Sequence, residues 1–215
     1  MRFPNAFEGV KKLFKSEILQ IIAVIAMILG AVFGILTAMA ADADNVSGAL
    51  GFAIPTLVCM LAGAVLAVIA FIMQLRGLNT AAKDEPKFKT ALMFVLIGIA
   101  GSILSGISSE NLAILKDIGT IVTNVSSIFI TYYVIEGVGS LAKQYGNEAI
   151  VKKGKTIMYM IAGVYVLSLI ASILSSFVLD GTAAAVVSLI ASILTLIQYI
   201  IYLTFLSDAK KMLAQ

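Results

Sequence analysis

The sequence predicts an all-α integral membrane protein, a bundle of six transmembrane helices. Of the 215 residues, 60% are apolar and 13% are charged, whereas about a quarter of the residues in a soluble domain are charged. Six apolar runs each approach or exceed the roughly 20 residues that a helix needs to cross a bilayer. The segments between these runs carry basic residues almost entirely on one side, as multi-pass membrane proteins do.

The six expected spans follow one another along the chain with short connections. They cover about Ile18–Ala40, Gly51–Leu75, Thr90–Ser108, Ile118–Val138, Thr156–Val178 and Thr182–Phe205. As helices, they satisfy every backbone amide within the segment, which the lipid interior requires. The three prolines lie at or near the expected ends of elements, so no span is expected to break at mid-membrane. Together the spans form one transmembrane domain, residues 18–215.

Charge distribution predicts the orientation. Of the 15 lysines and arginines, all except Lys116 fall on one side of a six-span arrangement. The positive-inside rule therefore places both termini in the cytoplasm, with the protein in the cytoplasmic (cell) membrane. A secretory signal cleaved after Ala38-Met39-Ala40 is an alternative for the first run, but the run is longer than the roughly 7–15 apolar residues of such signals.

Residues 1–17 form a basic amphipathic segment. Phe3, Phe7, Val10 and Phe14 recur at helical spacing, with lysines lying mostly between them. Such a segment predicts a short helix that lies in the membrane interface against anionic lipid. Two alternatives remain open: the segment docks on the cytoplasmic ends of the bundle, or it runs continuously into the first span.

A short phrase recurs at the cytoplasmic exit of each even-numbered span. It reads "TAAK" at Thr80–Lys83, "SLAK" at Ser140–Lys143 and "SDAK" at Ser207–Lys210. The entries of the odd spans are also alike, with "KFKTALMF" before the third span and "KGKTIMYM" before the fifth. The pattern predicts three similar hairpins, about 10–82, 83–142 and 143–210, related by a pseudo-threefold axis along the membrane normal. Chance likeness of apolar helices with snorkelling lysines is the alternative.

The segments "NAFEGVKKLFKSEIL" and "AAKDEPKFKTAL" resemble an uncharacterised family of small multi-pass bacterial membrane proteins. This resemblance implies a membrane location and brings no activity with it. Mitochondrial carriers also contain three two-helix repeats, but their proline and charged-pair signature is missing here.

Each span carries a stripe of small or weakly polar residues on one helical face. Packing between helices explains such stripes, and Gly30 with Gly34 forms a GxxxG pair of this kind. The alternative is that some stripes line a narrow path for a solute. The candidate polar lining or packing residues are Asn124, Ser127, Thr131, Ser192, Thr195, Gln198, Tyr199 and Tyr202.

Two charges, Arg76 and Glu136, come closest to the bilayer from equivalent places in the first two hairpins. They are candidate interfacial charges. An ion pair between hairpins is one interpretation, and independent snorkelling to the cytoplasmic surface is the other.

The chemistry that is missing decides the expected function. The chain has no His and one Cys, and no ionisable residue lies near the middle of an expected span. We therefore expect no enzyme activity, no metal or other cofactor, and no nucleic-acid partner. The sequence favours a non-catalytic membrane module that binds a partner protein or lipid. The alternative is a small channel or facilitator for a neutral or weakly polar solute.

Overall fold

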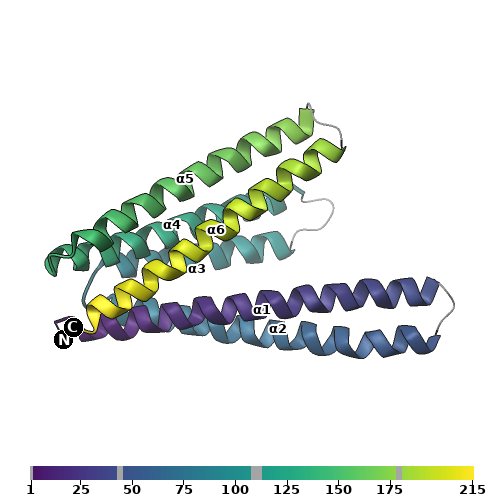
Figure 1. Ribbon diagram of the computed structural model, residues 1–215, viewed down its shortest axis with the longest axis horizontal. Coiled ribbons are helices and arrows are strands. Elements are labelled where there is room, and N and C mark those ends of the chain that lie inside the picture. The colour runs from purple at the N-terminus through teal and green to yellow at the C-terminus, as the bar shows by residue number, and fades with distance from the viewer. Residues whose placement is uncertain (1, 43–45, 108–112, 178–180) are drawn as a thin grey trace. The chain divides into compact units, whose positions relative to one another are not determined.

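The computed structural model describes residues 2–42, 46–107, 113–177 and 181–215, except for the side chains of residues 42, 46, 107, 113, 165–177, 181–193, 195 and 196. Every element in the described part is an α-helix. The helices are α1 (Pro4–Asp42), α2 (Val46–Ala81), α3 (Lys87–Ile107), α4 (Ala113–Gln144), α5 (Glu148–Phe177) and α6 (Gly181–Leu213), as Figure 1 shows.

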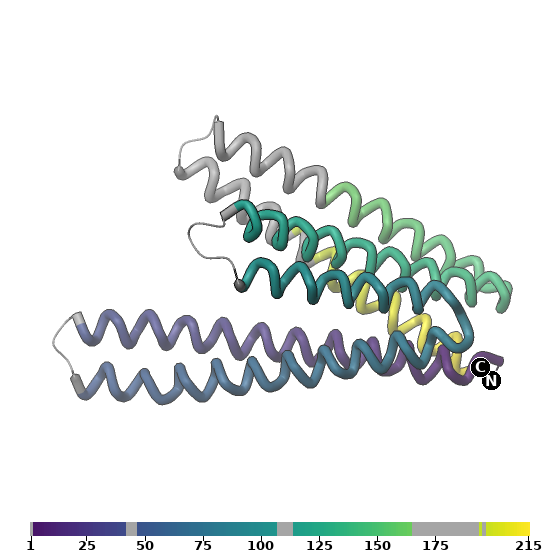
Figure 2. The backbone as a smooth tube through the Cα atoms, turned by 180° about the vertical axis from the view of Figure 1, so that it is seen from behind, coloured from purple at the N-terminus to yellow at the C-terminus, as the bar shows by residue number. Residues whose placement is uncertain are grey.

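Among the residues that the structure describes, four helices are long and apolar enough to cross a membrane. The candidate spans are Pro4–Ala41, Ser47–Ala81, Lys87–Gly106 and Ile114–Gln144. In the most apolar 18-residue stretch of each span, only 11–22% is buried. Exposed apolar surface of this extent suits contact with lipid tails. The expected fifth and sixth spans, 156–178 and 182–205, include residues outside the described part, which are grey in Figure 2.

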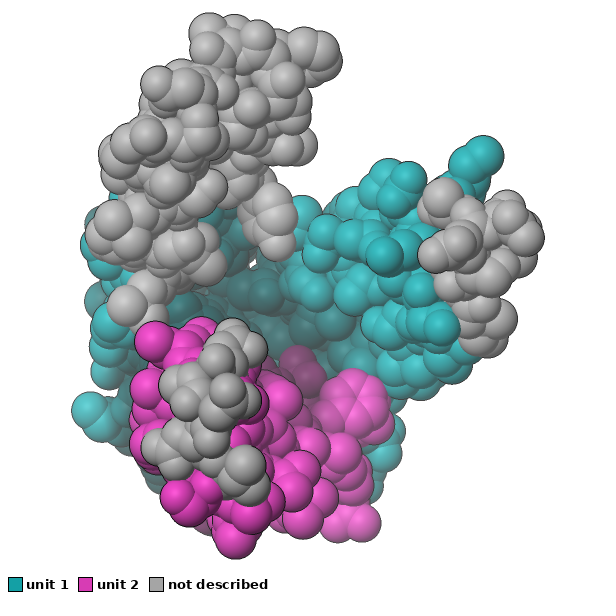
Figure 3. All heavy atoms as spheres, turned by 90° about the vertical axis from the view of Figure 1, so that its right-hand side faces the viewer, with its two compact units in different colours: residues 1–11, 78–215 teal, residues 12–77 magenta. Residues whose placement is uncertain are grey.

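The chain divides into two compact units, coloured in Figure 3. Unit 2 is residues 12–77, which comprise most of α1 and α2. These two helices approach closely: a Cβ built on Gly63 would lie 2.7 Å from Cγ of Met27 and 3.1 Å from the carbonyl oxygen of Ala23. The outward side chains of unit 2 are apolar, for example Ile35, which is 62% exposed, and Leu57, which is 70% exposed.

Unit 1 is residues 1–11 with residues 78–215, and its chain ends and short connections gather at one end. The start of the chain contacts both connections, because Asn5 donates to Asp84 and Arg2 donates to the carbonyl oxygen of Gln144. Asn147 and Gln215 line the same small hollow. We call this the basic end of unit 1: residues 2–11, the connections 82–86 and 145–147, and the adjoining helix turns.

The tightly packed core of unit 1 lies near the basic end. Phe88, Val138, Leu141, Ile157 and Phe205 are all fully buried there. Farther along the same helices, large apolar side chains are exposed, among them Leu96, Ile114 and Ile121. The basic end is therefore packed like a water-soluble protein, and the rest of α3 and α4 has a surface suited to lipid.

The amino-terminal segment differs from the expected separate helix. Residues 4–17 are the first turns of α1, a single helix of 39 residues. At 1.5 Å per residue, α1 is about 58 Å long, roughly twice the thickness of a hydrocarbon core. Lys11, Lys12 and Lys15 lower the local hydropathy, but lysine is a good helix former, so nothing in this segment ends the helix.

Candidate functional site

Helices α3 and α4 meet along a seam of small residues. A Cβ on Gly101 would lie 2.9 Å from the carbonyl oxygen of Gly119, and a Cβ on Gly119 would lie 2.6 Å from that of Gly101. Hydroxyl groups face one another beside this contact, with Ser102 Oγ 3.3 Å from Thr123 Oγ1. Such distances are long for hydroxyl hydrogen bonds, so close backbone packing is the main attraction at this seam.

The polar residues singled out on α4 lie beside this seam. Asn124 and Ser127 are exposed, and Thr131 is half-buried. The Ser127 hydroxyl donates to the carbonyl oxygen of Thr123 and the Thr131 hydroxyl to that of Ser127, at 3.0 and 3.1 Å. Both bonds stay within α4, so these hydroxyls satisfy themselves locally.

The packing face of α4 is formed by Gly119, Thr123 and Ser126, which are not among the residues predicted from the sequence. Ser126 is 2% exposed, and a Cβ on Gly98 of α3 would lie 3.3 Å from its Cβ. Both sets on α4 consist of small residues at steps of three and four. Spacing alone could not tell which set faces α3.

The other stripe residues lie on α6 and in unit 2. Gln198 and Tyr199 are half-buried and Tyr202 is buried, while the side chains of Ser192 and Thr195 lie outside the described residues. In unit 2, a Cβ on Gly30 would lie 2.9 Å from Cγ of Met60, and one on Gly34 would lie 3.7 Å from Cγ2 of Thr56. The two glycines therefore lie where α1 approaches α2.

Of the two candidate interfacial charges, Glu136 is bound within its own hairpin. The Lys87 ammonium, in the first turn of α3, donates to the Glu136 carboxylate on α4. Arg76 is exposed on α2 and belongs to unit 2.

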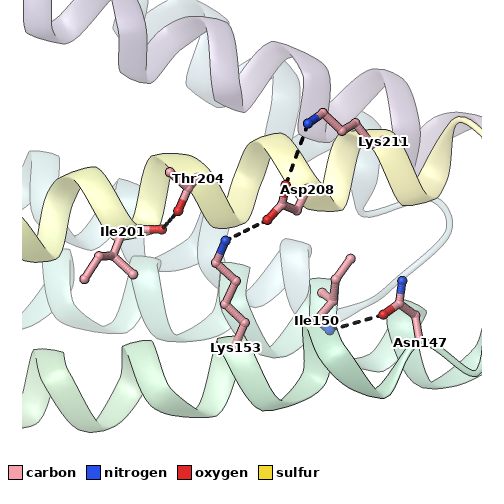
Figure 4. Close-up of polar contacts among 7 residues, drawn as sticks. All are labelled: Asn147, Ile150, Lys153, Ile201, Thr204, Asp208 and Lys211. Carbon is pink, nitrogen blue, oxygen red and sulfur yellow. Dashed lines mark hydrogen bonds and ion pairs between the residues drawn. The ribbon is translucent and has the colours of Figure 1, made fainter.

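A second lysine–carboxylate pair joins α5 to α6. Lys153 Nζ lies 2.6 Å from Asp208 Oδ2, and Lys211 Nζ lies 3.9 Å from the other oxygen of that carboxylate, as Figure 4 shows. The side chains of Lys153 and Asp208 are 33% and 42% exposed, so the pair is worth at most about 1 kcal/mol. The pair marks where the first turns of α5 lie beside the last turns of α6 at the basic end.

No three His, Cys, Asp or Glu side chains of the described part of the chain lie together as a metal site would require. Comparison with protein-family models, curated proteins and solved structures found no match for this chain.

Proposed function

We propose that this protein is a non-catalytic module of the cytoplasmic membrane, with six spans and both termini inside, which binds a partner protein or lipid through its outward helical faces. The observation that carries the proposal is the position of Asn124 and Ser127. Both are exposed on α4 within a candidate membrane span, on a helix whose neighbouring face is closed against α3 by Gly119 and Ser126.

Six spans are supported by helix length. Helices α5 and α6 have 30 and 33 residues, and each exceeds the roughly 20 residues needed to cross a bilayer. A common side for the termini is supported by the basic end of unit 1, where the first residues, both short connections and the last residues gather. The lysines concentrated there favour the cytoplasmic side.

Two hairpins of unit 1 support the internal repeat. Lys87 and Lys153 occupy the same place in the matching phrases "KFKT" and "KGKT", and each binds a carboxylate on the next helix of its own hairpin. One residue later, Phe88 of α3 packs where Gly137 of α4 leaves space, whereas Gly154 of α5 leaves space for Phe205 of α6. Phe88 and Gly154 occupy the same place in these two phrases, whereas Gly137 and Phe205 lie one place apart when the closing phrases "SLAK" and "SDAK" are aligned.

A partner in the membrane explains the exposed Asn124 amide on α4, since the neighbouring Ser127 and Thr131 hydroxyls already bond within the helix. An amide side chain facing lipid tails is unfavourable, and a hydrogen bond to a neighbouring helix recovers about 0.6–2 kcal/mol. The module is favoured over the channel because the hydroxyl groups of α3 and α4 lie against one another in the seam or bond within their own helix, and so contribute little polar lining to a path.

Site-specific photo-cross-linking in native membranes tests this function. A photoreactive residue at Asn124 or Ser127 should capture a defined protein or lipid, identified by mass spectrometry after gentle purification. The matched control is Ser126, which is one residue away and buried against α3, and should cross-link only within the chain. Capture of bulk lipid alone, together with solute flux in liposomes that depends on Asn124 or Tyr199, would replace the module with the channel.

A further inference from the structure

A basic hollow lies between α4 and α5 at the basic end of unit 1. Two adjoining cavities of about 370 and 200 Å³ share Lys143, Val151 and Lys155 among their lining residues. Because three lining residues are common, the two hollows are direct neighbours, and we call them together the basic groove. Its walls come mainly from the last turns of α4 and the first turns of α5, and Lys87 at the start of α3 adds one more side chain.

The charge of this groove is positive. Four lysines line it, namely Lys87, Lys143, Lys152 and Lys155, against the two carboxylates of Glu136 and Glu148. Glu136 is already bound to Lys87. Within the described residues, the ammonium groups of Lys143, Lys152 and Lys155 form no ion pair. The end of α4 and the start of α5 both lie there, and since their dipoles oppose one another, the lysine side chains carry the attraction for an anion.

An apolar hollow lies next to the basic groove, along the same two helices. A third cavity, of about 340 Å³, is lined by Ile128, Tyr132, Met158, Tyr159, Ile161 and Ala162. Met158 also lines the basic groove, so the apolar hollow adjoins it along α5. From Glu136 to Ile128, α4 advances by about 12 Å, which is close to the roughly 15 Å depth of one leaflet of hydrocarbon.

We propose that this groove binds one anionic phospholipid of the cytoplasmic leaflet. The phosphate lies over Lys143, Lys152 and Lys155, and an acyl chain lies along Tyr132, Met158 and Ile161. Only a molecule with an anionic head and an apolar tail matches both parts, since a free phosphate leaves the apolar part empty. Tyr159, which is 78% exposed, has the amphipathic ring typical of the headgroup level. The inference rests on the membrane placement in the proposed function, but not on the partner captured at Asn124.

Native mass spectrometry of the full chain tests the proposal. The protein is stripped of lipid and then returned to mixed micelles of phosphatidylglycerol and phosphatidylcholine. One phosphatidylglycerol molecule should remain bound in preference to phosphatidylcholine. The double variant Lys143→Gln/Lys155→Gln should lose this preference roughly thirtyfold, because two cations near the phosphate are removed, each worth about 1 kcal/mol. The matched control, Lys83→Gln/Lys89→Gln, removes two exposed lysines of the same end that do not line the groove, and should bind as the unaltered protein does.

A second variant separates the lipid from a soluble phosphate. Ala162→Trp fills the apolar part and should weaken retention of phosphatidylglycerol without changing the binding of glycerol 3-phosphate. Equal retention of both lipids, equal loss in the control variant, or full binding by Ala162→Trp would each overturn the lipid site. Failure of the protein to enter lipid nanodiscs would instead refute the membrane placement of the proposed function.

Discussion

The carboxylate of Asp84 caps a helix that begins 80 residues earlier in the chain, because its Oδ2 accepts a hydrogen bond of 2.7 Å from the backbone N–H of Ala6. Its other oxygen accepts from the side-chain amide of Asn5 at 2.8 Å. Helix α1 begins at Pro4, which has no N–H to satisfy. The preceding residue, Phe3, has no side chain that can cap the helix. Asp84 therefore supplies the cap from the connection between α2 and α3, and its negative charge also suits the positive end of the helix dipole.

Replacing Asp84 with alanine should destabilise the docked start of α1. We expect a loss of about 1–2 kcal/mol in the free energy of unfolding, the usual cost of removing a helix cap, and faster proteolysis within residues 2–11. Thermal unfolding in detergent and limited proteolysis measure the two effects. Glu8→Ala is the control, since the exposed pair of Glu8 with Lys11 contributes only a few tenths of a kcal/mol. Equal stability of the two variants would show that Asp84 is not a cap.

Glycine 119 should tolerate no side chain. In Gly119→Ala, the new Cβ would meet the carbonyl oxygen of Gly101 and the backbone nitrogen of Ser105, both at 2.6 Å. Backbone atoms cannot rotate away, so α3 and α4 must separate, with a loss of stability of about 1–3 kcal/mol. Thermal unfolding in detergent provides the measurement.

The matched control for this contact is Gly106→Ala in α3. A Cβ at Gly106 meets nothing within 4 Å, and alanine is the better helix former by up to about 1 kcal/mol. Gly106→Ala should therefore leave stability unchanged or raise it. If both variants were equally stable, the seam would not be closely packed.

Hydropathy and charge were sufficient to predict an all-helical membrane protein, because the apolar runs that form α1 to α4 are long. They were not sufficient at the basic end. There the helices extend past the apolar runs because side chains distant in sequence, such as Phe88 and Phe205, are buried against other helices. Lys153 and Asp208 likewise come together only through tertiary packing. On α4, Thr123 and Asn124 belong to adjacent faces with the same spacing, so composition could not distinguish packing from exposure.

Truncation of either packed phenylalanine should be costly. Phe88→Ala and Phe205→Ala each remove a fully buried ring, and we expect losses of about 3–5 kcal/mol from the cavity and the lost burial. Phe129→Ala, at a ring that is 39% exposed, should lose clearly less. Chemical or thermal unfolding in detergent measures all three. Small and equal losses would show that the ring–glycine contacts do not hold these hairpins together.

The orientation of the chain can be read from single cysteines in a Cys59→Ala background. Lys83→Cys and Lys116→Cys both replace exposed lysines, one at the basic end of unit 1 and one near the start of α4. If the basic end is cytoplasmic, as the positive-inside rule requires, a membrane-impermeant maleimide added to intact cells should label Lys116→Cys at once. Lys83→Cys should be labelled only after the membrane is permeabilised. The reverse pattern would place both termini outside. Labelling of both positions in intact cells would show that α3, which lies between them in the chain, does not cross the membrane.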